Sequence, residues 1–275
     1  MTPHIAANRA IFRKLHETGC FVLPNPWDVG GARMLQSLGY KAIASTSAGF
    51  AWSIGRADNR VSLDEVLDHL AALSHGCDLP VNADFENGFA KDPEALAMNV
   101  SRAVDAGVSG LSVEDLTGDA DHGLFDLDYA VERIAACRNA IDASETGVIL
   151  VARTEGLLIG ALDATGAIAR LVAYAEAGAD CLYAPGLRRP EDIAALVAAV
   201  APKPVNVLVN GPGLTVAEAA ALGVRRISIG GALARAAWSG FLKAAEEIAA
   251  SGDFAVLAQG APGKRLNETF AGFGG

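Results

Sequence analysis

The sequence predicts an α/β fold, a (β/α)8 TIM barrel with one extra N-terminal helix. Three observations lead to this prediction: the chain length, an alternation of helical and β-rich segments, and glycines at the helix-to-strand junctions. A chain of 275 residues suits such a barrel, which typically needs about 250. With 51% hydrophobic and 20% charged residues it can bury one sizeable core. We expect a single domain over residues 1–275, with a C-terminal tail from about residue 255.

One local pattern marks the junctions between helices and strands. A helical apolar period ends at a glycine, and a short β-rich run follows, in LQSLGYKAIAS, AVDAGVSGLSV, YAEAGADCLYA and AALGVRRISIG. A helix C-terminus often needs the left-handed conformation that glycine adopts easily. The glycines of these segments, Gly39, Gly107, Gly178 and Gly223, therefore indicate where helices end.

Eight β-rich runs alternate with helical stretches. They cover residues 21–24, 42–45, 80–84, 110–114, 148–153, 181–184, 204–209 and 226–230. Strands separated by helices predict parallel crossover units, and eight of them favour a closed barrel. The alternative is an open doubly wound sheet, but no G-x-G-x-x-G follows the first run. A helix over residues 3–18 is expected to precede the barrel and cover its lower end.

Composition limits the partners of this chain. Its net charge of −10 repels nucleic acid and anionic membranes, so we expect neither as a partner. No stretch approaches the roughly 18 consecutive apolar residues of a membrane span. Basic residues interrupt the N-terminal apolar runs, unlike those of a signal peptide, and the four cysteines form no C-x-x-C pair. We expect a cytoplasmic protein.

Charged residues gather where the third, fourth and fifth β-rich runs end: Asp84, Glu86, Glu114, Asp115, Arg153 and Glu155. Carboxylates held close together repel one another unless a cation lies among them, and oxygen-only ligands favour Mg²⁺, or Mn²⁺ in its place. Zinc is disfavoured, because only His122 of five histidines lies near a strand end. Alternate strand residues point the same way, so Asp84 and Glu86 are expected to face one metal. The alternative is that these acids cap helices or pair with arginines.

Arg153 is the cation of this group. Its planar guanidinium can bind a carboxylate through two hydrogen bonds, which suits a keto acid or dicarboxylate substrate. The alternative is a structural pair with Glu86, Glu114 or Glu155. After the second run, Ser45, Thr46 and Ser47 could hold an oxyanion through hydroxyl and N–H groups, or form a plain Ser/Thr turn.

Several segments together resemble the isocitrate lyase/phosphoenolpyruvate mutase superfamily, between about residues 20 and 240. They are LPNPWDVGGARMLQSLGYKAIASTSAG, GRAD, NADFENGF, VEDLTG, VARTEG, YAPG, VNVL and RRISIGGALARAAW. The resemblance implies a (β/α)8 barrel that binds Mg²⁺ and an α-keto acid. NADFENGF is similar to the family's D-x-D-x-G-[YF]-G metal signature, with Glu86 in place of the second aspartate and Ala90 in place of the last glycine.

The resemblance also implies roles for individual residues. Asp84 would bind the metal directly, while Glu86, Glu114 and Asp58 would hold metal-bound waters. Arg153 would contact the substrate carboxylate, and Thr46 and Ser47 would hold a carboxylate through backbone N–H groups. Substrate contacts are further implied for Ser45, for Trp27 at the start of the first barrel helix, and for Asn206 in VNVL.

The loop after Glu114 departs from the family pattern. Isocitrate and methylisocitrate lyases carry K-[KR]-C-G-H there, and the mutases a lysine and an asparagine. This chain reads EDLTGDADHG over residues 114–123, without any of these groups. His122 is the only obvious proton-transfer residue nearby, and a solvated loop histidine is the alternative.

The sequence therefore predicts a Mg²⁺-dependent lyase that acts on a small 2-oxo acid through an enolate, with oxaloacetate decarboxylation as the leading candidate. The alternatives are C–P cleavage or a mutase reaction on a phosphonopyruvate-like substrate, (methyl)isocitrate lyase-like cleavage, and a non-catalytic keto-acid binding protein. The resemblance further implies a homotetramer in which the last barrel helix, here residues 231–252, packs against a neighbour. Trp238 and Phe241 of this helix would then face the partner; the alternative is that they face the barrel's own core.

Overall fold

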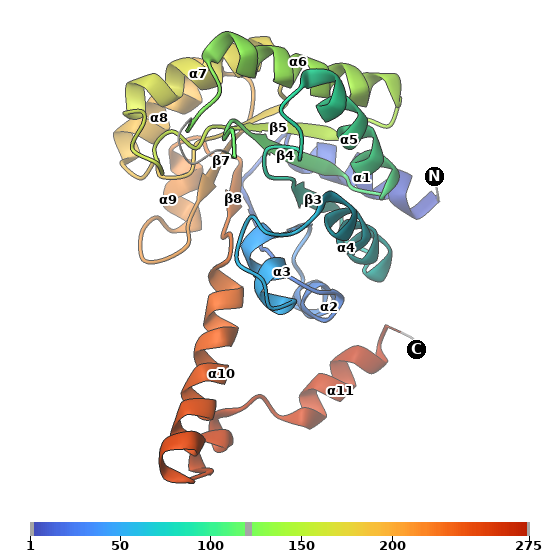
Figure 1. The fold of residues 1–275 in the computed structure, drawn as a ribbon, viewed down its shortest axis with the longest axis vertical. Coiled ribbons are helices and arrows are strands. Elements are labelled where there is room, and N and C mark those ends of the chain that lie inside the picture. The colour runs from blue at the N-terminus through green and yellow to red at the C-terminus, as the bar shows by residue number, and fades with distance from the viewer. Residues whose placement is uncertain (1–2, 119–122, 274–275) are drawn as a thin grey trace.

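Eight parallel strands form the centre of the molecule in the computed structural model, and helices surround them (Figure 1). The structure describes residues 3–118 and 123–273. The strands are β1 (Phe21–Leu23), β2 (Ile43–Ala44), β3 (Val81–Asp84), β4 (Gly110–Glu114), β5 (Ile149–Arg153), β6 (Cys181–Tyr183), β7 (Val205–Leu208) and β8 (Arg226–Ser228). Each lies inside the run that the sequence predicts.

The strands pair in the order β1-β8-β7-β6-β5-β4-β3-β2. Between the two ends of this series, the Ala44 N–H donates to the Pro24 carbonyl at 3.0 Å and brings β2 beside the end of β1. The predicted (β/α)8 barrel is confirmed. An open doubly wound sheet is excluded, because its strand order reverses at a switch point and this order does not.

The helices alternate with the strands along the chain. They are α1 (Pro3–Leu15), α2 (Val29–Ser37), α3 (Ser47–Ser53), α4 (Leu63–Gly76), α5 (Pro93–Asp105), α6 (Leu127–Ala143), α7 (Ala164–Glu176), α8 (Pro190–Val200), α9 (Val216–Ala221), α10 (Ala232–Ser251), the 3-10 helix η1 (Ala255–Gln259) and α11 (Gly263–Ala271). The four predicted junction glycines all have positive φ, between 85° and 105°. Their assignment as helix ends is confirmed.

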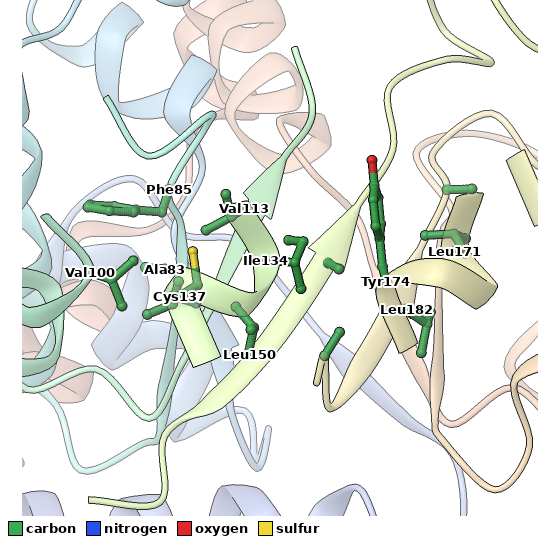
Figure 2. Close-up of a cluster of buried hydrophobic side chains, with 14 of the residues drawn as sticks. Ala83, Phe85, Val100, Val113, Ile134, Cys137, Leu150, Leu171, Tyr174 and Leu182 are labelled. Carbon is green, nitrogen blue, oxygen red and sulfur yellow. The ribbon is translucent and has the colours of Figure 1, made fainter. Parts of the chain in front are cut away.

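Two of three apolar regions lie on the two sides of the strands, and the third packs α2 and α4 against β2 and β3. The larger lies between the strands and the surrounding helices, and Figure 2 shows part of it, with Val113 and Leu150 from strands facing Ile134 and Cys137 from α6. The smaller contains residues of β1, β2, β5 and β6 together with Phe12 of α1. Since apolar residues occupy these regions, the polar side chains of the strand ends collect at the opposite mouth.

The N-terminal helix α1 closes the lower end of the barrel, as the sequence predicts. Phe12 is fully buried and packs on inward-facing residues such as Leu23 and Ile149. A Cβ at Gly110 would lie 2.6 Å from the Phe12 ring, so the glycine at the start of β4 makes room for it. The helix ends at Leu15, three residues before the predicted boundary, and a turn continues the chain.

We expect Phe12→Ala to lower the free energy of unfolding by about 3–5 kcal/mol, because it leaves a cavity in the barrel floor. Its neighbour Ile11 is 48% exposed, so Ile11→Ala removes a similar apolar side chain without opening a cavity. Urea unfolding of the two variants measures the difference. Equal stability of both would contradict the role of Phe12 as the plug of the barrel.

The C-terminal helices extend beyond the barrel. In Figure 1, α10 projects away from the strands, and α11 returns toward α2 of the same chain. The C-terminal tail thus contains a 3-10 helix and an α-helix. The contact with α2 includes the Arg33 guanidinium, which lies 5.4 Å from the centre of the Phe273 ring.

Within residues 3–118 and 123–273, the structure contains no helix with the length and apolar character needed to cross a bilayer. All four cysteines are free thiols. The cytoplasmic location stays a prediction.

Candidate active site

The last residues of β3, β4 and β5 meet at the mouth of the barrel. The Arg153 Nη1 atom lies 3.2 Å from Asp84 Oδ1, and its Nε atom lies 3.4 Å from Glu114 Oε2. Nε also contacts the carboxylate of Glu155. The three strand ends therefore bring Asp84, Glu114 and Glu155 together with Arg153. Asp115, which the sequence places in the same group, lies outside it, because its carboxylate binds Tyr174 and Arg170 of α7.

Serines at the end of β2 hold the Asp84 carboxylate in place. Both the N–H and the hydroxyl of Ser47 donate to Asp84 Oδ2, at 3.0 and 3.1 Å. The Ser45 hydroxyl accepts the Asp84 N–H at 2.8 Å. The Ser47 N–H, a candidate for substrate binding, is thus engaged by Asp84 in this structure, and its role toward substrate stays a prediction.

Thr46 acts as a helix cap in this structure. Its hydroxyl accepts the Gly49 N–H at 3.2 Å and begins α3, and its side chain is buried. The Thr46 side chain thus has the local capping role that a plain Ser/Thr turn predicts. Ser45 and Ser47 instead bind Asp84.

Glu86 reaches the cluster by a route that differs from the predicted one. The strand ends at Asp84, and Glu86 lies in the following turn with φ 47°, so strand alternation does not set its direction. A left-handed conformation is costly for a non-glycine residue and is typical of functional sites. Gly88 in the same turn has φ 77°, and a Cβ there would lie 2.0 Å from a Leu96 methyl group. The explanation from strand alternation is wrong, although Glu86 does lie near Asp84.

The cluster carries more negative than positive charge. Burial, and then Asp84 and Asp58, raise the pKa of Glu86 to about 7. Burial likewise raises the pKa of Glu114, because Arg153 opposes but does not outweigh desolvation and the neighbouring carboxylates. Asp58 lies in the exposed loop between α3 and α4, where partial burial and Asp84 raise its pKa. A cation would relieve this repulsion.

The raised pKa values predict how the metal-free protein responds to pH. Because the folded-state pKa of Glu86 lies above its ordinary value, its contribution to stability is complete below about pH 4.5 and is lost as pH rises through 7. We expect the melting temperature in a metal chelator to fall by roughly 3 °C between pH 6 and 8.5. Differential scanning calorimetry of the wild type and of Glu86→Gln measures this. A fall of the same size in the variant would show that Glu86 is not its source.

A cavity of about 460 Å³ opens beside Glu86 and Glu114, two of the three acids with raised pKa. Glu86 and Glu114 form its polar wall, and its other described lining residues are Asn59, Val61, Asn87, Phe89, Leu116 and Gly118. None of these lining residues carries a positive charge. A second hollow of about 190 Å³ follows β6 and β7, but no carboxylate lines it. The acid-bordered cavity is therefore the candidate for substrate binding.

None of the predicted substrate contacts, Trp27, Ser45, Thr46, Ser47, Arg153 and Asn206, is among the lining residues of this cavity. Trp27 lines a groove of about 220 Å³ together with Trp238 and Phe241 of α10. Asn206 is buried in the barrel, where it accepts a hydrogen bond from Arg226 at 2.9 Å and donates one to Ser228 at 2.9 Å. Their contacts with substrate stay predictions. His122 lies outside the described residues.

Two residues of the site did not stand out as site residues in the sequence. The Tyr183 ring at the end of β6 lies 5.3 Å from the Arg153 guanidinium carbon. The Asn25 amide, 5% exposed, donates to the Ser45 carbonyl at 2.7 Å and accepts the Gly230 N–H at 2.9 Å. The sequence signal for both was their place directly after a predicted strand or at its end, in YAPG and PNPWD.

The donor set fits a hard cation. The side-chain donors of the cluster are oxygens, and five carboxyl groups face a single guanidinium: Asp58, Asp84, Glu86, Glu114 and Glu155, against Arg153. Among the described residues, no three His, Cys, Asp or Glu side chains lie close enough to form a metal-binding group by themselves. An ion held here would therefore keep several water ligands, as Mg²⁺ commonly does.

Comparisons with known proteins agree with this architecture. The family model for phosphoenolpyruvate phosphomutase matches residues 12–249. A solved structure from Burkholderia cenocepacia J2315, provisionally classed as a lyase/mutase, is 46% identical, covers 98% of both chains and has a TM-score of 0.94. The 2-methylisocitrate lyase of Escherichia coli K12 is 35% identical over 55% of this chain and 53% of its own. An oxaloacetate decarboxylase of Rhodopseudomonas palustris BisA53 is 29% identical over 62% and 57%.

Proposed function

This chain belongs to the phosphoenolpyruvate phosphomutase family, within a superfamily of lyases and mutases, and on that premise we propose that it is a Mg²⁺-dependent lyase of small 2-oxo acids. Oxaloacetate is the substrate that we propose first. The observation that carries the proposal is the cluster at the ends of β3, β4 and β5, where Asp84, Glu114 and Glu155 pair with Arg153. The carboxyl groups of Glu86 and Asp58 lie close enough to interact with it electrostatically. Such a cluster suits a divalent cation beside an anionic substrate.

Each residue of the cluster has a defined task in this proposal. Asp84 binds the metal ion directly, and Glu86, Glu114 and Asp58 hold its water ligands. Arg153 binds the substrate carboxylate through its guanidinium, whose Nη1 and Nε atoms also contact Asp84 and Glu155. When bound, Mg²⁺ would supply the positive charge that stabilises an enolate.

The cavity beside Glu86 and Glu114 favours decarboxylation over the other lyase reactions. The leaving carboxylate loses its charge as it becomes CO₂. The described residues of the cavity wall, among them Val61, Phe89 and Leu116, carry no positive charge and so do not stabilise the ground state against the transition state. A phosphonyl group, or the extra carboxylates of an isocitrate, would instead keep its charge and need a cation there. The relative named oxaloacetate decarboxylase supports the same choice.

The test is turnover by the purified protein with Mg²⁺. Pyruvate formation from oxaloacetate is followed with lactate dehydrogenase, against the uncatalysed rate in the same Mg²⁺ concentration. Phosphonopyruvate and 2-methylisocitrate are assayed in parallel, because cleavage of either in preference to oxaloacetate would replace the proposed substrate. Binding of pyruvate analogues without turnover of any of the three would identify a keto-acid binding protein instead.

We also propose that the chain assembles into a homo-oligomer, a tetramer by resemblance to its family, through α10. Only Ala234 of this 20-residue helix is buried, while Trp238, Phe241 and Leu242 are 38%, 61% and 48% exposed. An exposed apolar face of this kind is typical of an interface.

Phe241→Glu is expected to dissociate the oligomer, because it places a charge in the apolar face of α10. Light scattering coupled to size exclusion measures the mass of the wild type and the variant. Ile159→Glu, at a residue that is 45% exposed in the loop after β5, is the matched control and should leave the mass unchanged. A wild type that is monomeric at micromolar concentration would contradict the proposal.

A further inference from the structure

Asp115 follows Glu114 directly but serves a different part of the molecule. Its carboxylate is directed away from the barrel interior, toward Arg170 and Tyr174 of α7. It is 4% exposed, and its carboxylate accepts three hydrogen bonds. The Glu155 N–H donates to Oδ1 at 2.9 Å, while the Tyr174 hydroxyl and Arg170 Nη1 donate to Oδ2 at 2.7 and 3.2 Å. This carboxylate therefore joins the ends of β4 and β5 to α7.

Asp115 and Arg170 also fix both ends of the segment that follows β4. The Phe125 N–H donates to the Asp115 carbonyl at 2.9 Å, and Arg170 Nη1 donates to the Phe125 carbonyl at 2.9 Å. Leu116 and Leu124 form an antiparallel bridge just beyond. Asp115 and Arg170 thus hold the base of the loop whose sequence departs from that of the lyases and mutases.

Asp115 is also connected to Arg153, through Glu155. Asp115 binds the backbone of Glu155, and the Glu155 carboxylate contacts Arg153 Nε. Glu155 is 5% exposed, so its side chain has little freedom. Tyr174 belongs to the apolar region of α7, and Figure 2 shows its hydroxyl directed out of that cluster. A buried ion pair such as Asp115–Arg170 adds little net stability, which points to a role in geometry.

We propose that Asp115, held by Arg170 and Tyr174, is a positioning residue that sets the orientation of Arg153 through Glu155 and ties it to the base of the loop at 116–124. The proposal rests on the proposed function in so far as Arg153 binds the substrate carboxylate. It assigns Asp115 no contact with substrate or metal.

The test is oxalate binding in saturating Mg²⁺, measured by calorimetry, because oxalate is a planar dianion that resembles the enolate of pyruvate. Asp115→Asn keeps the volume of the side chain but removes its charge, and Tyr174→Phe removes a single hydrogen bond. We expect about tenfold weaker oxalate binding for the first variant and about threefold for the second, with Mg²⁺ affinity within twofold of wild type. Leu171→Ala, in the same helix and fully buried, controls for general destabilisation.

Oxalate affinity that is unchanged in Asp115→Asn, or lost equally in Leu171→Ala, would overturn the proposal. If Asp115→Asn does not fold, Tyr174→Phe against Leu171→Ala decides. A second measurement needs no ligand: the ¹⁵N resonance of Arg153 Nε, identified by its loss in Arg153→Lys, should shift in Asp115→Asn and stay in place in Leu171→Ala. If the wild-type protein binds no oxalate, that result counts against the proposed function. The shift of the Arg153 Nε resonance then tests by itself whether Asp115 positions Arg153.

Discussion

Asp84→Asn is expected to reduce turnover of oxaloacetate by roughly a thousandfold and to abolish Mg²⁺-dependent ligand binding. Asparagine keeps the shape of the side chain, but it removes the charge that a metal needs. Its amide NH₂ would also face either the donors of Ser47 or those of Arg153, which now bind the two carboxylate oxygens. Turnover is measured as kcat/KM, and Mg²⁺ affinity by titration in the presence of oxalate.

The matched control is Asp92→Asn. Asp92 is an exposed acid that caps α5, and asparagine serves equally well at a helix N-cap. Both variants make the same chemical change, so only the place of the carboxylate differs. Unchanged Mg²⁺-dependent binding in Asp84→Asn would show that the metal is held elsewhere.

The fold could be predicted from sequence because its signals are local. Each strand is a short apolar run, and glycines mark four of the helix ends with the positive φ that their role requires. The ends of β3, β4 and β5 were predictable for the same reason. The last residues of these strands point into a barrel whose mouth is its polar end, so Asp84, Glu114 and Arg153 had to meet.

The position of Glu86 could not be predicted from the local sequence. Its distance from Asp84 along the chain suggested a shared strand face, but the structure places it in a turn with φ 47°. The path of that turn depends on Leu96 of α5, which leaves no space for a side chain at Gly88. The alternation of residues along a strand cannot predict a contact between a turn and a helix that begins several residues later.

Trp27 and Asn206 mark a second limit. Both were implied by resemblance alone, and the structure places one against α10 and the other beside Arg226 inside the barrel. Which side of a loop residue faces a cavity depends on the packing of elements that are distant in sequence. Asp115 marks the same limit: the sequence groups it with the acids of the strand ends, but the structure directs its carboxylate to Tyr174 and Arg170 of α7.

Arg153→Gln is expected to lower kcat/KM for oxaloacetate by at least a hundredfold, because it removes the charge and the paired donors that bind the substrate carboxylate. It should also lower the free energy of unfolding of the metal-free protein by about 3 kcal/mol, since Asp84, Glu114 and Glu155 would lose their shared cation. The measurements are steady-state kinetics and urea unfolding of the same preparations.

Arg153→Lys separates binding of substrate from pairing with the acids. Lysine restores a positive charge among the carboxylates, so stability should return in part, whereas its single ammonium cannot reproduce the planar pair of donors that a carboxylate requires. We therefore expect Arg153→Lys to be more stable than Arg153→Gln and nearly as inactive. If arginine serves only as the structural partner of Glu155 and Glu114, lysine should restore activity and stability together. Recovery of both activity and stability in Arg153→Lys would therefore contradict the proposal that Arg153 binds the substrate. The substrate carboxylate would then be bound by other groups.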